Sequence, residues 1–258
     1  MTVVAVFPLA PLATLQLRQI FEAVQAGFPS PAQDYDDGPL NLLQVLIDDE
    51  AATTATRAVG DAMLGAGIYD GDVALVDTSK EPHDGDVVFA ILDGEFSMRR
   101  LTRRQGTWAL RAEGPGWPDV LVDELSTLTI VGVVTVSFRF HRSRTPAFDE
   151  GALNLHPLLI DDEVATFVVR VAGSSMIEAG IYDGDVALVD RSKRPRDQDV
   201  VVAYVDGDFT IKRLIQQGDS WALRAENAEW PDVVVDELSS LSVFGVVTVS
   251  CRFHRPRR

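Results

Sequence analysis

Short runs of β-branched and aliphatic residues, separated by turn residues, make up most of the hydrophobic pattern along the chain. They include residues 72–77 (DVALVD), 199–214 (DVVVAYVDGDFTIKRL) and 241–253 (LSVFGVVTVSCRF). Runs of this length, bounded by Asp, Gly or Ser, are typical of β-strands. An Asp-Gly pair at Asp70, repeated at Asp183, predicts a tight turn. The pairs at Asp93 and Asp206 fit hairpin loops. We therefore expect a mainly β fold.

One stretch has the spacing of an amphipathic helix. In LATLQLRQIFEAVQAG, residues 12–27, apolar residues recur near i, i+3 and i+4, and a glycine follows as a stop signal. We expect a helix there. A second, shorter helical turn is expected just after Ser175, in SMIEAG.

The chain repeats itself at a shift of 113 residues. Residues 38–145 align with residues 151–258 without a gap, and more than half of the aligned positions are identical. The segment GIYDGDVALVD, for example, begins at both Gly67 and Gly180. A long unit that occurs twice predicts a duplicated domain rather than a solenoid of short repeats.

The repeat divides the chain into three expected segments. They are an N-terminal arm, a first domain and a second domain, over residues 1–37, 38–145 and 146–258, with residues 143–151 (SRTPAFDEG) as the linker. Two equivalent halves are expected to pair as the subunits of a dimer do, about a pseudo-twofold axis. The GVVTVS segments at Gly132 and Gly245 are candidates for that interface.

Composition excludes several function classes. The net charge is −16, so a large direct nucleic-acid interface is not expected. The single cysteine, Cys251, forms no internal disulfide, which fits a reducing cytoplasm. It aligns with Phe138 in an apolar run and is expected in the core or at an interface. No basic start and no run of 18 apolar residues is present, so neither a signal peptide nor a membrane span is expected.

The basic C-terminal residues, the tryptophans and the histidines are expected to have no catalytic or ligand-binding role. The basic end, HRPRR (254–258), is expected to be a solvated tail. Four tryptophans recur at the repeat shift, which indicates packing: Trp108, Trp117, Trp221 and Trp230. The histidines show no ligand spacing, so no metal site is expected: His83, His141, His156 and His254. No organic cofactor is expected either.

The two copies differ at a pair of positions that matter chemically. Ser175 and Lys212 in the second copy correspond to Ala62 and Arg99 in the first. On a strand, Lys212 shares its face with Thr210 and Leu214, and burial of that face would lower the lysine pKa. A neutral amine can then take the proton of a serine hydroxyl and activate it as a nucleophile. Arginine remains charged and cannot act in this way.

Around these residues the chain resembles the LexA/UmuD family of self-cleaving serine peptidases, and most closely its UmuD-like members. The segments that carry the resemblance are GSSMIEAGIYDGD around Ser175, residues 189–214 ending in IKRL, and FGVVT at Phe244. It implies two tandem copies of the LexA/signal-peptidase-like β fold. It also implies Ser175 as nucleophile, with its backbone N–H in the oxyanion hole, and Lys212 as general base. Ala62 and Arg99 are then the positions of a degenerate dyad.

The resemblance further implies a substrate, which is the protein's own arm. UmuD-like proteins are cut between a small residue and glycine, ahead of a GFPSP segment, and Ala26–Gly27 in QAGFPSP matches this. The arm occurs once, so the copy with the scissile bond lacks the dyad. The arm would therefore have to enter the site of the second copy. We also expect the family's partners: a RecA filament on single-stranded DNA that stimulates cutting, and a UmuC-like Y-family DNA polymerase in translesion synthesis during the SOS response to DNA damage.

Three alternatives stay open at this point. A LexA-like repressor needs a helix-turn-helix domain ahead of the cut, for which 26 residues are too few. A signal peptidase shares the fold and the dyad but needs a membrane anchor. A non-catalytic pseudo-dimeric scaffold that regulates a polymerase or a repressor would have no working dyad in either half.

Overall fold

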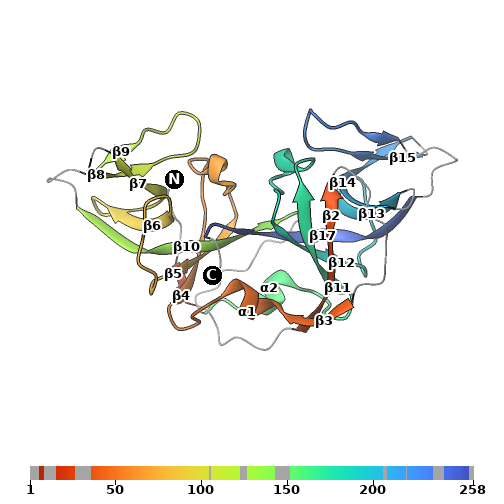
Figure 1. The fold of residues 1–258 in the computed structure, drawn as a ribbon, viewed down its shortest axis with the longest axis horizontal. Helices are drawn as coiled ribbons and strands as arrows, with labels where there is room; N and C mark the ends of the chain where they lie inside the picture. The colour runs from red at the N-terminus through yellow and green to blue at the C-terminus, as the bar shows by residue number, and fades with distance from the viewer. Residues whose placement is uncertain are drawn as a thin grey trace.

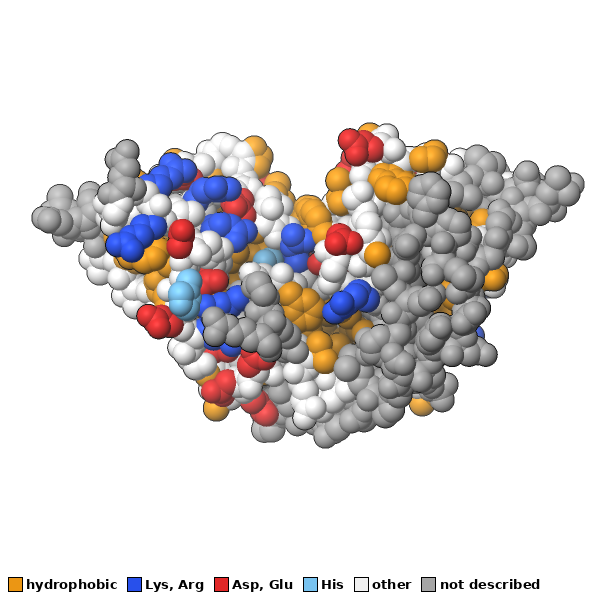
Figure 2. Space-filling model, viewed as in Figure 1, with side chains coloured by type: hydrophobic (Ala, Val, Ile, Leu, Met, Phe, Trp, Pro, Cys, Tyr) orange, Lys and Arg blue, Asp and Glu red, His pale blue; other side chains and the backbone are white. Residues whose placement is uncertain are grey.

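The mainly β fold expected from the sequence is confirmed by a computed structural model, which describes residues 6–8, 16–26, 36–104, 106–122, 127–142, 152–205, 208–218, 220–234 and 241–255. The predicted linker, the Asp206 hairpin loop and Gly27 lie outside these residues. Two lobes stand on either side of a notch (Figures 1 and 2). Lobe 1 runs from β4 (Thr53–Arg57) to β10 (Leu128–Phe140), with β1 (Val6–Pro8) paired at its edge. Lobe 2 runs from β11 (Thr166–Gly173) to β17 (Leu241–Phe253). No helix in the described ranges is long and apolar enough to span a bilayer.

Lobe 1 is a chain of antiparallel strand pairings. In pairing order its strands are β1 (Val6–Pro8), β4 (Thr53–Arg57), β5 (Val73–Asp77), β10 (Leu128–Phe140), β6 (Val87–Leu92), β7 (Glu95–Arg104), β8 (Thr107–Arg111) and β9 (Val120–Leu121). The turn between β6 and β7 contains Asp93 and Gly94, both at positive φ (49° and 87°), as the hairpin prediction requires.

Lobe 2 repeats this order at the same shift along the chain. Its strands are β11 (Thr166–Gly173), β12 (Val186–Asp190), β17 (Leu241–Phe253), β13 (Val200–Val205), β14 (Asp208–Gln217), β15 (Ser220–Arg224) and β16 (Val233–Val234). Gly71 and Gly184 turn the chain at equivalent points, each at a positive φ (85° and 82°). The two Asp-Gly turns predicted there are confirmed.

The long strands β10 and β17 join the lobes by pairing with each other. Val136 pairs with Phe253 and Phe140 with Val249, so the equivalent residues Phe138 and Cys251 face each other at the centre. The pairing has pseudo-twofold symmetry. The two strands that carry the GVVTVS segments form the junction, but only the last two residues of each segment lie in the pairing. Cys251 is fully buried, and burial raises the pKa of its thiol, which fits the predicted packing role.

Two short helices lie together below this junction (Figure 1). They are α1 (Leu42–Leu46) and α2 (Leu155–Leu159), and their leucines join Phe138 and Cys251 in one apolar cluster that spans both lobes. Neither helix was predicted, because five residues are too few to show a helical period. Burial of these leucines at the junction, rather than helix propensity, stabilises them.

The helix predicted over residues 12–27 is wrong. Residues Gln16–Ala26 form the strand β2, which lies parallel to β11 on one side and antiparallel to β3 (Asp36–Asn41) on the other. A strand at the edge of a sheet presents unpaired N–H and C=O groups, and here the edge of β11 pairs with this segment. Tertiary pairing on both sides outweighs the helical spacing, which is a weak preference.

Polar contacts between the lobes also come in equivalent pairs. Arg139 forms an ion pair with Asp72 in its own lobe (2.9 Å) and donates to the carbonyl of Ala179 in lobe 2 (3.3 Å). Arg252 donates to the carbonyl of Ala66 in lobe 1 (2.9 Å). Arg139 and Arg252 are equivalent positions of the two copies, so each lobe donates an arginine to a backbone carbonyl of the other lobe.

Two histidines also form equivalent contacts between the lobes. Nε2 of His141 lies 2.9 Å from Oγ of Ser250, and Nε2 of His254 lies 2.8 Å from Oγ of Ser137. Burial, with nearby arginines, lowers the pKa of both histidines to about 3. No sequence pattern marked this role, because each histidine lies more than 100 residues from its serine partner.

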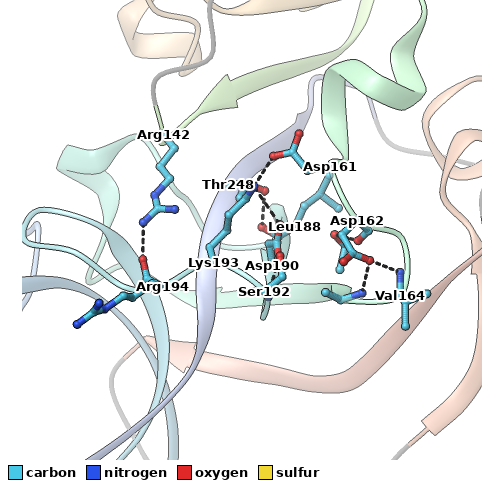
Figure 3. Close-up of polar contacts among 12 residues, drawn as sticks. Arg142, Asp161, Asp162, Val164, Leu188, Asp190, Ser192, Lys193, Arg194 and Thr248 are labelled. Atoms are coloured by element: carbon cyan, nitrogen blue, oxygen red, sulfur yellow. Dashed lines mark hydrogen bonds and ion pairs between the residues drawn. The ribbon is translucent and has the colours of Figure 1, made fainter.

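The C-terminal segment was expected to be a solvated tail, but its described part, which ends at Arg255, contacts the rest of the protein. Arg142 in lobe 1 forms an ion pair with Asp199 (2.6 Å) and donates to the carbonyl of Arg194 in lobe 2 (2.7 Å; Figure 3). Its equivalent, Arg255, reaches back to Asp86 in lobe 1 (3.4 Å). The basic residues at the end of each copy therefore hold the opposite lobe.

Candidate functional site

The turn that follows β11 presents Ser175. Gly173, at φ 87°, donates its N–H to Oδ1 of Asp183 (2.8 Å), which fixes the chain as it leaves the strand. The predicted short helical turn is the 3₁₀ helix η2 (Ile177–Ala179). Glu226 closes the turn, because its N–H donates to the carbonyl of Ser175 (2.8 Å). Ser175 is completely buried.

Lys212 projects from β14 toward this serine. Its Nζ lies 2.7 Å from Oγ of Ser175 and 3.3 Å from the carbonyl oxygen of Ile211. Only 3% of the residue's surface is exposed. The structure thus brings together the two residues that the comparison of the copies singled out.

Burial changes the chemistry available to this amine. Loss of hydration lowers the pKa of Lys212 to about 8, against the raising effect of Asp232. With this pKa, roughly a tenth of the amine is uncharged at pH 7 and about half at pH 8. An uncharged amine at 2.7 Å can accept the hydroxyl proton and leave a nucleophilic oxygen.

The N-terminal strand β2 ends beside the same turn. In its parallel register with β11, Val24 pairs with Val171 and Ala26 pairs with Gly173, two residues before Ser175. β2 also contacts β14, the strand that carries Lys212. The carbonyl end of Ala26 therefore belongs to the neighbourhood of the serine–lysine pair, while Gly27 lies outside the described residues.

Lobe 1 keeps the frame of this site without its two reactive groups. Ala62 is fully buried at the serine position, and Glu113 donates its N–H to the Ala62 carbonyl (2.7 Å) as Glu226 does to Ser175. Arg99, at the lysine position, donates Nη1 to the carbonyl of Met98 (3.0 Å). Ala62 has no hydroxyl that could act as a nucleophile, and the guanidinium of Arg99 cannot act as a base.

Sequence reasoning missed the residues that brace the serine turn. Trp230 donates Nε1 to Oγ of Ser174 (3.1 Å), and Asn227 donates to the carbonyl of Ser174 (2.9 Å). In lobe 1, Trp117 donates to Asp61 in the same way (2.6 Å) and is 40% exposed. Trp117 is therefore not packed in the core as expected, whereas Trp230 is partly buried and also donates a hydrogen bond. Their recurrence at the repeat shift was the signal, but it does not distinguish a packed ring from an indole donor.

Comparison with known families finds two matches along the chain. The model of the family described as Peptidase S24-like matches residues 19–135 and again residues 137–248. Each match covers one lobe almost completely. The repeat found in the sequence therefore coincides with two occurrences of one family pattern.

Curated relatives show the same likeness over shorter spans. SamA of Salmonella typhimurium is 40% identical over 124 residues, which are 48% of this chain and 84% of SamA. ImpA of Escherichia coli is 45% identical over 89 residues, 34% of this chain and 61% of ImpA. The LexA repressor of Clostridium acetobutylicum is 41% identical over 70 residues, 27% of this chain and 34% of that protein.

Proposed function

Because this chain belongs to the Peptidase S24-like family, we propose that it is a self-cleaving serine peptidase in which lobe 2 cuts the Ala26–Gly27 bond of the N-terminal arm. The observation that carries this proposal is the buried contact of 2.7 Å between Nζ of Lys212 and Oγ of Ser175. The parallel register that ends with Ala26 opposite Gly173 supports the choice of bond.

The reaction follows from these positions. Neutral Lys212 takes the proton of Ser175, and Oγ adds to the carbonyl carbon of Ala26 while the Ser175 N–H helps to stabilise the oxyanion. The carbon–nitrogen bond breaks, and the lysine ammonium gives its proton to the departing amine of Gly27. Water, deprotonated by the same lysine, then hydrolyses the ester and leaves a carboxylate on Ala26.

We further propose that the chain is a tandem duplication, with an arm over residues 1–37 and domains over 38–145 and 146–258. The first domain has the degenerate positions Ala62 and Arg99, and the second has the dyad. Since β2 lies on lobe 2 of its own chain, the cut is intramolecular. Its rate should therefore not depend on protein concentration.

The proposed biological setting is the SOS response. A RecA filament on single-stranded DNA stimulates the cut, and the processed chain serves a UmuC-like Y-family DNA polymerase in translesion synthesis. Protein partners suit the surface better than DNA does. The net charge is −16, and arginines of lobe 1 that face solvent are engaged, Arg100 and Arg111 with Glu113 and Arg104 with Asp119.

Incubation of the purified chain at pH 9 tests the chemistry. Mass spectrometry should detect loss of residues 1–26 from the unsubstituted chain but not from Ser175→Ala or Lys212→Ala. Ser220→Ala is the matched control, because it removes an exposed serine hydroxyl at the start of β15, away from the dyad, and should still cut. Undiminished cutting in Ser175→Ala would assign the cut to another protease, and no cutting under any condition would favour a non-catalytic scaffold.

Addition of an activated RecA filament tests the setting. The filament should increase the rate of cutting in the unsubstituted chain and leave Ser175→Ala intact. An unchanged rate would remove RecA from the proposal without affecting the dyad chemistry.

A further inference from the structure

Lobe 1 contains an unusual cation at the position that corresponds to Lys212. Arg99 is only 7% exposed, and its Cζ lies 5.4 Å from the centre of the Trp117 ring. Nη1 donates to the carbonyl of Met98, but no described residue accepts a hydrogen bond from the buried Nε. A buried guanidinium with an unused donor is unfavourable unless an acceptor completes it.

The nearby carboxylates do not supply that acceptor. Oδ1 of Asp61 accepts a bond from Trp117 (2.6 Å), and both carboxylate oxygens of Glu113 accept bonds from Arg100 (2.8 Å each). Within the described ranges, no ion pair involves Arg99. Burial alone lowers its pKa, with no contribution from a neighbouring acid, and the group still remains charged.

The backbone around this cation is arranged as in lobe 2. Gly60, the equivalent of Gly173, has φ 84° and donates its N–H to Asp70 (2.8 Å). Ala58 exchanges hydrogen bonds with Gly71 and Asp72 as its equivalent in lobe 2 does. In lobe 2 this arrangement accepts the last residues of β2. In lobe 1, β1 pairs with Thr54–Thr56 and does not extend to residues 58–60.

We propose that lobe 1 is a binding site for the free carboxylate at the end of a peptide, held by Arg99 beside Ala62 and Trp117. A guanidinium binds a carboxylate through two parallel hydrogen bonds, which would also complete the unused donor. The peptide would extend along residues 58–60 as β2 extends along β11. The proposal rests on the proposed function only for the identity of the ligand, because cutting after Ala26 creates such an end. That end would reach lobe 1 only from an arm that has left its pairings with β11 and β3.

Calorimetric titration of the full chain carrying Ser175→Ala tests this, with a synthetic peptide of residues 22–26 (EAVQA) as the probe. The free acid should bind at least tenfold more tightly than the C-terminal amide. Arg99→Gln should abolish that preference, and Arg99→Lys should keep part of it. Equal affinity of acid and amide would overturn the proposal even if Arg99→Gln failed to fold.

A variant in the other lobe locates the site. Lys212→Met in the same background should leave the preference for the acid unchanged. Loss of the preference in Lys212→Met, with retention in Arg99→Gln, would place the peptide in lobe 2 and overturn the proposal. Cutting is measured separately on the unsubstituted chain, so failure of either proposal is recognised independently of the other.

Discussion

At the scale of single residues, one position of the repeat holds a lysine that can act as a base in lobe 2 and an arginine that stays charged in lobe 1. Lys212 and Arg99 project from equivalent strands, and each donates a hydrogen bond to the carbonyl of the preceding residue. Burial lowers the pKa of each, but only the amine comes near neutrality, at about 8. The choice between lysine and arginine therefore decides whether proton transfer is available.

The pH dependence of self-cutting should report this amine. Only uncharged Lys212 can accept a proton, so the rate should rise about tenfold per pH unit below the pKa of about 8 and level off above it. Single-turnover loss of residues 1–26, followed between pH 6 and pH 10, measures the profile. A rate that is constant or falls with rising pH would contradict the assignment of the base.

Much of the candidate site could be predicted because the repeat provides an internal control. Ser175 and Lys212 were identified because the equivalent residues, Ala62 and Arg99, offer no hydroxyl and no amine that can lose its charge. The period of a strand then places Lys212 on a defined face. The bracing residues Trp230 and Asn227 could not be found in this way, because their donors act on a turn more than 50 residues earlier.

At the scale of elements, β2 brings the proposed substrate, the bond after Ala26, close to the serine–lysine pair. Its sequence has helical spacing, yet it forms a strand because β11 and β3 pair with it on both sides. A pattern of apolar residues reports what a segment could bury, but it does not show which edges the rest of the chain leaves open. The short helices α1 and α2 were missed because five residues are too few to show a helical period, and their leucines are buried in a cluster that both lobes build.

Proline in the middle of β2 should stop cutting while the dyad stays intact. Ile20 pairs with Val169, and proline there removes an N–H and fixes φ in a strand paired on both sides. We expect Ile20→Pro to lower the rate at least tenfold. Ile20→Val keeps the N–H and serves as the control, and equal rates in the two variants would show that β2 pairing is not needed.

Cutting should not by itself release the arm. β2 precedes the scissile bond, but it lies between β11 and β3, so the fragment of residues 1–26 keeps its pairings on both sides. The cut protein should elute as one species in size-exclusion chromatography and separate into two only on a denaturing gel. Elution of the fragment alone under native conditions would contradict this expectation.

At the scale of the whole molecule, the junction should make the fold sensitive to acid. In the native state His141 and His254 stay neutral down to a pKa of about 3, whereas in the unfolded chain they take up protons below about 6.5. The free energy of unfolding should therefore fall as the pH drops from 6.5 to 3, by at most about 1.4 kcal/mol per pH unit for each histidine.

Urea unfolding at several pH values measures this effect. Carboxylates contribute to acid unfolding as well, so the informative quantity is the difference between the unsubstituted chain and a His141→Asn/His254→Asn double variant. The double variant should show a shallower loss of stability between pH 6.5 and pH 4. Identical slopes would mean that the histidines are already accessible to protons in the native state.

The pairing of β10 with β17 occurs within one covalent chain. Two separate subunits joined by the same strands would come apart on dilution, to an extent set by their dissociation constant. Here the tether keeps each half at a high effective concentration for the other, so the assembly persists at any copy number in the cell. A half with the serine–lysine pair and a half without it thus remain together in a fixed one-to-one ratio, with no exchange of halves between molecules.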